Sequence, residues 1–163
     1  MKKLLTLLLA AVLVLSLAAC GSEPAPTEPQ EPGYAFVYKN TSIEMGVDAA
    51  PILEALGDPV SCTEETSCAF EGLDRTYYYG SFYLQTSPEG EKENIYSLWL
   101  ADDTVTTPEG LFIGAPQAQV EALYGAEGFN GSNAYVMKKG PSRLTVILED
   151  GLVSSIQYQW EIA

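Results

Sequence analysis

Ile43-Glu44-Met45-Gly46 and Ala49-Ala50-Pro51-Ile52-Leu53-Glu54-Ala55-Leu56-Gly57 form a pattern that returns 68 residues later in the chain. The second copy reads Leu111-Phe112-Ile113-Gly114 and Gln117-Ala118-Gln119-Val120-Glu121-Ala122-Leu123-Tyr124-Gly125. In both copies, apolar residues alternate up to a glycine, as they do in a strand. A second glycine then ends a segment whose apolar residues have helical spacing, which is typical of a helix C-terminus. The chain therefore carries an internal duplication.

The residues after each copy predict β-structure. Apolar and aromatic alternation indicates strands over residues 68–73, 77–85, 94–100, 134–138, 143–148 and 152–160. Asp150-Gly151 is a typical two-residue hairpin turn. The predicted fold class is α+β, with two tandem repeats over residues 34–103 and 104–163. Each repeat is a short helix packed on a three- to four-stranded antiparallel sheet.

This organisation resembles two known families. The spacing of the apolar-x-apolar-Gly and Leu-Gly motifs, with a cysteine pair after the first helix, is similar to that of the β-lactamase-inhibitor-protein fold. It is also similar to the envelope-assembly lipoproteins of the small-protein-A (BamE-like) type. The first resemblance implies two tandem helix-plus-sheet units that bind a partner through an aromatic-rich concave sheet. The second repeat carries no cysteines, in which it departs from the inhibitor.

The N-terminus has the pattern of a secretory signal peptide. Lys2 and Lys3 precede an uncharged apolar run over residues 4–19, and Leu17-Ala18-Ala19 leads directly into Cys20. This layout resembles the lipobox of bacterial lipoproteins, which implies that residues 1–19 are removed and that Cys20 is acylated. Residues 20–33 are then a tether rich in Pro and Glu, whose composition cannot bury enough apolar surface to fold. We therefore expect a lipid anchor on the extracytoplasmic face of the cell membrane, or on the outer membrane in a host with two membranes.

Composition excludes several classes of function. Without Lys2 and Lys3, the mature chain has 6 basic and 22 acidic residues, a formal charge of −16 that disfavours nucleic-acid binding. The chain contains no histidine, which removes Ser-His and Cys-His nucleophiles and most zinc and copper sites. We expect no catalytic residues, no cofactor and no metal ion. Acidic clusters such as Glu64-Glu65 and Asp102-Asp103 leave calcium open, although none matches an EF-hand.

Two cysteines remain besides Cys20. Cys62 and Cys68 are an even pair in a chain with an export signal, so we expect one structural disulfide, with free thiols as the alternative.

Strand alternation over residues 77–85 predicts a binding face. Phe82 and Leu84 are the better core residues, so Tyr77, Tyr79 and Tyr83 are expected on the opposite face. In the neighbouring strand, Leu98 and Leu100 belong inside, which turns Trp99 outward. Four aromatic side chains on an open sheet face are suited to binding a protein or a glycan. The alternative is that these rings pack on the second repeat or on an N-terminal strand over residues 34–38.

These observations favour a membrane-anchored, extracytoplasmic binding module without enzymatic activity. The alternatives are a structural or envelope-assembly lipoprotein and a small hydrolase that uses carboxylates.

Overall fold

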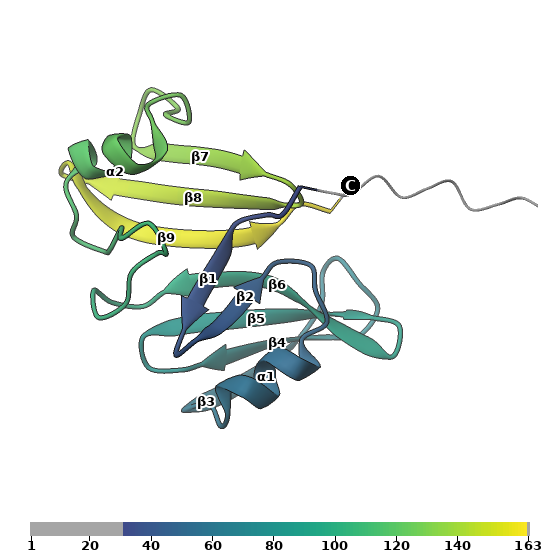
Figure 1. Cartoon of the computed structure of the whole chain (residues 1–163). Coiled ribbons are helices and arrows are strands. Elements are labelled where there is room, and N and C mark those ends of the chain that lie inside the picture. Colours follow the sequence, from purple (N-terminus) through teal and green to yellow (C-terminus); the bar gives the residue numbers. More distant parts are fainter. Residues whose placement is uncertain (1–30, 163) are drawn as a thin grey trace, which may run out of the picture.

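The computed structural model describes residues 31–162. The signal peptide, the acylation site Cys20 and the tether up to residue 30 lie outside the described residues. Figure 1 gives the element labels. The nine strands are β1 (Ala35–Tyr38), β2 (Thr41–Glu44), β3 (Ser61–Thr66), β4 (Leu73–Tyr78), β5 (Phe82–Glu89), β6 (Lys92–Leu100), β7 (Ala134–Lys139), β8 (Ser142–Glu149) and β9 (Leu152–Trp160). The two helices are α1 (Ala50–Leu56) and α2 (Gln117–Tyr124).

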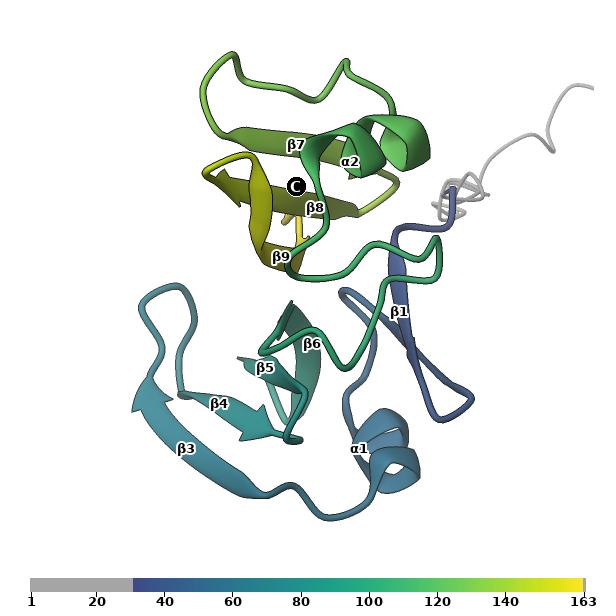
Figure 2. The ribbon, with the colours of Figure 1, turned by 90° about the vertical axis from the view of Figure 1, so that its left-hand side faces the viewer.

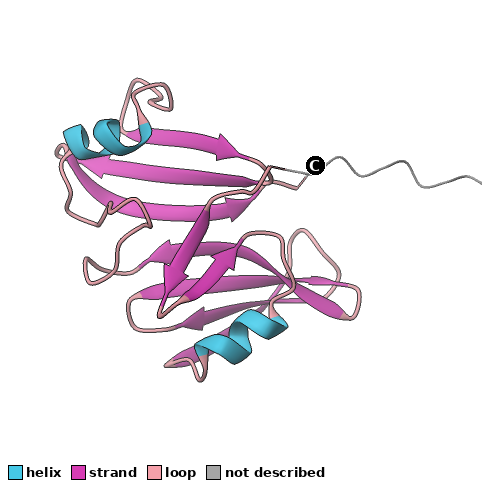
Figure 3. Cartoon of the chain, viewed as in Figure 1, coloured by secondary structure: helices cyan, strands magenta, loops and turns pink. Residues whose placement is uncertain are grey.

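The strands form one large sheet rather than two. Seven strands pair in the order β3-β4-β5-β6-β9-β8-β7, and β1 and β2 form a separate hairpin. The described residues are mostly β, with 48% strand and 11% helix (Figure 3). The predicted fold class, two helix-on-sheet repeats in an α+β arrangement, is therefore wrong. The prediction fails because β6 and β9 pair with each other. The edges at which the two predicted sheets would have ended are thereby joined into one continuous sheet.

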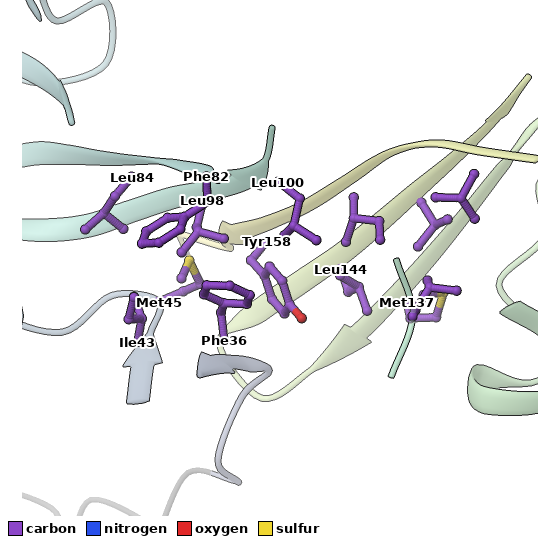
Figure 4. Packing of buried hydrophobic residues seen from close by; sticks show 14 of the residues in the cluster. Phe36, Ile43, Met45, Phe82, Leu84, Leu98, Leu100, Met137, Leu144 and Tyr158 are labelled. Carbon is purple, nitrogen blue, oxygen red and sulfur yellow. The ribbon is translucent and has the colours of Figure 1, made fainter. Parts of the chain in front are cut away.

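One hydrophobic core lies between the large sheet and the elements that cover it. Figure 2 shows both helices and β1 on the same side of the sheet, so within residues 31–162 the other side carries no helix. The β1–β2 hairpin packs over the junction of β6 and β9. There the ring of Phe36 lies 5.2 Å from that of Phe82 and 6.1 Å from that of Tyr158 (Figure 4). This hairpin joins the apolar residues of the two halves into a single cluster.

The duplicated sequence makes matching local contacts within this sheet. The N–H of Gly46 donates to the carbonyl of Ile95, and that of Gly114 donates to the carbonyl of Val153, both at 2.7 Å. Three residues after each glycine, a second pair of backbone hydrogen bonds also corresponds between the two halves. The N–H of Ala49 donates to the backbone carbonyl of Glu93 at 2.8 Å, and that of Gln117 donates to the backbone carbonyl of Gly151 at 3.0 Å. Each helix start is thus held against the beginning of a central strand, β6 or β9.

Most predicted strands are confirmed, but the two that follow Cys62 are not. Strands β6, β7, β8 and β9 cover the expected ranges, and Asp150-Gly151 forms the expected turn, both residues having positive φ. The predicted strand over 68–73 is a loop for most of its length. The predicted strand over 77–85 is interrupted, because Gly80 has a φ of +89° and the chain reverses between β4 and β5.

Candidate binding face

The face of the large sheet that carries no helix is called the outer face here. The strand registers align two neighbouring rows of residues across all seven strands on this face. The first row consists of Ser61, Tyr78, Tyr83, Trp99, Gln157, Thr145 and Val136. The second row consists of Thr63, Thr76, Gln85, Ser97, Gln159, Arg143 and Lys138. Together these rows form the outer band, which spans about 29 Å at the usual spacing of strands.

Three aromatic rings stack along the first row of the outer band. The ring of Tyr78 lies 4.5 Å from that of Tyr83 at an interplanar angle of 25°. The ring of Tyr83 lies 5.1 Å from that of Trp99 at 13°. All three side chains are half-buried. Because near-parallel neighbours cover each other's faces, these rings turn mainly their edges toward solvent.

The outer band contains no acidic residue, although the chain has 22. Its only charged members, Arg143 and Lys138, pair with Glu161, with nitrogen–oxygen distances of 3.0 and 2.5 Å. The hydrogen bond from Lys138 holds the pKa of the Glu161 carboxyl below its usual range, and Arg143 adds to the effect. Gln159 donates to the Tyr96 hydroxyl at 3.1 Å. The charged side chains of the band are thus paired with Glu161 beside it, Gln159 is bonded to Tyr96, and the aromatic centre of the band is uncharged.

Of the four aromatic residues predicted for this face, two lie on it and two lie on the core side of the sheet. Tyr83 and Trp99 lie on the outer face, as expected from their neighbours. Tyr77 pairs with the buried Leu84 and packs against the core, so its predicted outward position is wrong. Tyr79 is also turned to the core side, because it lies in the β4–β5 turn and its ring stacks on that of Phe82 at 5.2 Å.

Tyr78, which the sequence pattern did not place on the outer face, takes the position expected for Tyr77. The reversal at Gly80 exchanges the inward and outward positions of the residues before it, while those after it keep the predicted alternation. The glycine among aromatic strand residues was the available signal, since an isolated glycine in a strand pattern often marks an irregularity.

The predicted disulfide is absent from the described part of the chain. Cys62 and Cys68 are both free and exposed. Cys62 lies in β3, whose extended backbone runs on to Thr66 before the loop that holds Cys68 begins. At about 3.3 Å per residue, four residues of strand already span about 13 Å. The strand therefore carries the chain away from Cys62, and the two cysteines do not lie at disulfide distance.

We expect both thiols to react without reduction. Thiol titration of the mature chain with Cys20→Ser, under denaturing and non-reducing conditions, should count two free thiols. In the native state both should also react, because both side chains are exposed. A count of zero would contradict this prediction, because a bridge between Cys62 and Cys68 would require the strand pairing near Thr66 to break.

The described residues contain neither a cluster of metal ligands nor a membrane-spanning helix. Within residues 31–162, no group of three or more Cys, Asp or Glu side chains is arranged to hold a metal ion. Neither described helix has the length and apolar character needed to cross a bilayer.

The comparisons with known proteins give little. No family model matches the chain, and no curated protein matches it. Among solved structures, it is similar to an extracellular protein containing an SCP domain from Bacillus anthracis str. Ames, with 14% identity and a TM-score of 0.43. The match covers 77% of this chain and 50% of the other, so this chain spans about half the length of that structure. A similarity at this TM-score carries no argument about fold or function.

Proposed function

We propose that this chain is a membrane-anchored, extracytoplasmic lipoprotein that catalyses no reaction and binds another protein through the outer band. The observation that carries the proposal is the acid-free outer band with its stacked Tyr78, Tyr83 and Trp99. Protein interfaces favour aromatic centres from which charge is depleted. Neither row carries a carboxylate in a chain with a formal charge of −14, and Glu161 beside the rows neutralises the charges of Arg143 and Lys138.

The ring orientation favours a protein over a glycan as the partner. A sugar ring stacks on the face of an aromatic side chain, and here each ring has at least one face against a neighbour. Ring edges and the adjacent Gln and Thr side chains instead match the apolar and backbone groups of a protein surface. The proposal therefore narrows the two kinds of partner expected from sequence to one.

Quantitative affinity capture from envelope extracts of the producing cell tests this function. The mature chain, Trp99→Ala and Leu123→Ala are compared, the last being an exposed apolar position on α2, away from the outer band. We expect a protein that is enriched by the first and third and depleted for Trp99→Ala. A partner embedded in the membrane would favour the envelope-assembly role. Equal enrichment by all three chains would contradict binding through the outer band.

The anchor is a separate prediction. Cys20→Ser should block acylation, so the precursor stays unprocessed or the chain leaves the membrane fraction. Cell fractionation and the mass of the N-terminal peptide measure both effects. A mutant that is processed and membrane-bound like the wild type would show that the leader is not a lipoprotein signal.

A further inference from the structure

A cavity opens on the helix-covered side of the sheet, between α1 and the β5–β6 hairpin. Its volume is about 310 Å³, at the lower end of the range for small-molecule sites. Ala49, Leu53 and the ring of Tyr77 form its apolar part. The side chains of Asp48 and of Glu91-Lys92-Glu93 form its charged rim. The cavity and the outer band lie on opposite faces of the sheet.

The corresponding place in the other half of the sheet is closed by hydrogen bonds. There, the N–H of Gln117 binds the start of β9 just as that of Ala49 binds the start of β6. The Gln117 side-chain amide donates to the Tyr135 hydroxyl at 2.9 Å, and this hydroxyl donates to Glu121 at 2.6 Å. Tyr135 is fully buried. Gln117 and Glu121, four positions apart on α2, thus both bond the Tyr135 hydroxyl of β7 and fill the space between the helix and the sheet.

Register identifies Tyr77 as the counterpart of Tyr135. Tyr77 pairs with Leu84, which pairs with Leu98 of the central strand β6. In the same way, Tyr135 pairs with Val146, which pairs with Ile156 of the central strand β9. The tyrosine is therefore present at the same place in both halves.

The helix residues above the two tyrosines differ. With the 68-residue offset of the duplication, Ala49 stands where Gln117 stands and Leu53 where Glu121 stands. Ala49 and Leu53 cannot donate or accept a side-chain hydrogen bond. Tyr77 is accordingly only half-buried, and the space that Gln117 and Glu121 fill beside α2 remains open beside α1. Burial raises the pKa of the Tyr77 phenol above its usual value, and the nearby Cys62 adds a smaller rise.

The charges at the rim select the ligand. The rim has three carboxylates and one ammonium group, and Lys92 already lies 3.5 Å from Asp48. The nearby Arg75 is also engaged, since it pairs with Glu64 and Glu93. The same ion pairs also occupy two of the rim carboxylates, Asp48 and Glu93. An anion would therefore meet no cation outside an ion pair, whereas an ammonium group would meet the exposed carboxylate of Glu91 at the rim and the face of an aromatic ring inside.

We propose that the cavity between α1 and the β5–β6 hairpin binds a small organic cation, with its apolar body on Leu53 and Tyr77 and its ammonium group at the carboxylate rim. This inference is independent of the proposed protein partner. It rests on the difference between two corresponding places in one sheet, only one of which is sealed.

Ligand-observed NMR titration of the full mature chain in uncharged detergent tests the proposal. The probes are 2-phenylethylamine, 2-phenylethanol and phenylacetate, which share a body and differ in charge. We expect saturable binding of the amine, weaker binding of the alcohol and none of the anion. The double variant Ala49→Gln/Leu53→Gln, which rebuilds the seal without adding charge, should bind the amine at least about tenfold more weakly. Glu54→Gln, an exposed position on α1, should bind it as the wild type does.

A second variant keeps the test decisive if the sealed one folds poorly. Asp48→Asn/Glu91→Gln changes only rim side chains and should remove the preference for the amine over the alcohol. The proposal is overturned if the wild type shows no saturable binding of the amine, or if phenylacetate binds as tightly. It is equally overturned if a folded sealed variant binds the amine unchanged, or if the neutralised rim retains the preference.

Discussion

Phe82→Ala should lower the free energy of unfolding by about 3–5 kcal/mol, the usual range for emptying a buried aromatic site. Phe82 is fully buried at the start of β5. Its ring lies 4.9 Å from that of Tyr38 and 5.2 Å from that of Phe36, so it joins the β1–β2 hairpin to the large sheet. Removing it leaves a cavity at the place where the two halves of the core meet. Denaturant titration followed by circular dichroism measures the change.

Trp99→Ala is the comparison, because Trp99 is an even larger aromatic residue on a neighbouring strand but on the outer face. Its loss removes the stack on Tyr83, worth about 0.5–1.5 kcal/mol in aromatic pairs, together with part of its burial. We therefore expect a clearly smaller destabilisation than for Phe82→Ala. If the two variants lose equal stability, Trp99 is a core residue, and the interpretation of the outer band as a free surface fails.

The second large effect is expected on binding. Once the partner is purified, Trp99→Ala should weaken its binding by more than about 2 kcal/mol, roughly thirtyfold, as a tryptophan at the centre of an interface does. Trp99 lies in the middle of the first row, on the central strand β6. Tyr83→Phe keeps the stack and removes only a hydroxyl, so it should cost much less. Isothermal titration calorimetry measures both, and equal affinities for Trp99→Ala and wild type would exclude Trp99 from the interface.

Local sequence patterns predicted correctly those elements in which adjacent residues have a clear preference for the core, for solvent or for a turn. Leu98 and Leu100 on either side of Trp99 were enough to turn the tryptophan outward, and Asp150-Gly151 was enough to place a hairpin. The stretch from Tyr77 to Tyr83 failed because every residue in it suits a strand. Only the backbone reversal at Gly80 decides which tyrosine faces the core.

The continuous sheet was beyond prediction for a different reason. β6 and β9 are joined through only three residue pairs, Ser97 with Gln159, Leu98 with Tyr158 and Trp99 with Gln157. These partners are about sixty residues apart in the chain, and no turn signal links them. The outer band depends on this pairing, so its full extent could not be derived from alternation within single strands.

The cysteine pair shows a limit of spacing arguments. Five intervening residues are enough for a bridge if the chain between the cysteines turns, but residues 61–66 form an extended strand whose side chains are all exposed. Strand pairing with β4 keeps Cys62 opposite Tyr77, away from the loop that carries Cys68.

Site-specific photo-crosslinking in the producing cell tests the central claim, that the outer band binds a protein, most directly. A photoreactive residue is placed at Gln157, beside Trp99 in the outer band, or at Glu54, on the opposite side of the sheet. We predict one discrete cross-linked protein from position 157, lost when Trp99→Ala is added, and none from position 54. The same product from both positions, or a product at 157 that persists in Trp99→Ala, would contradict the account.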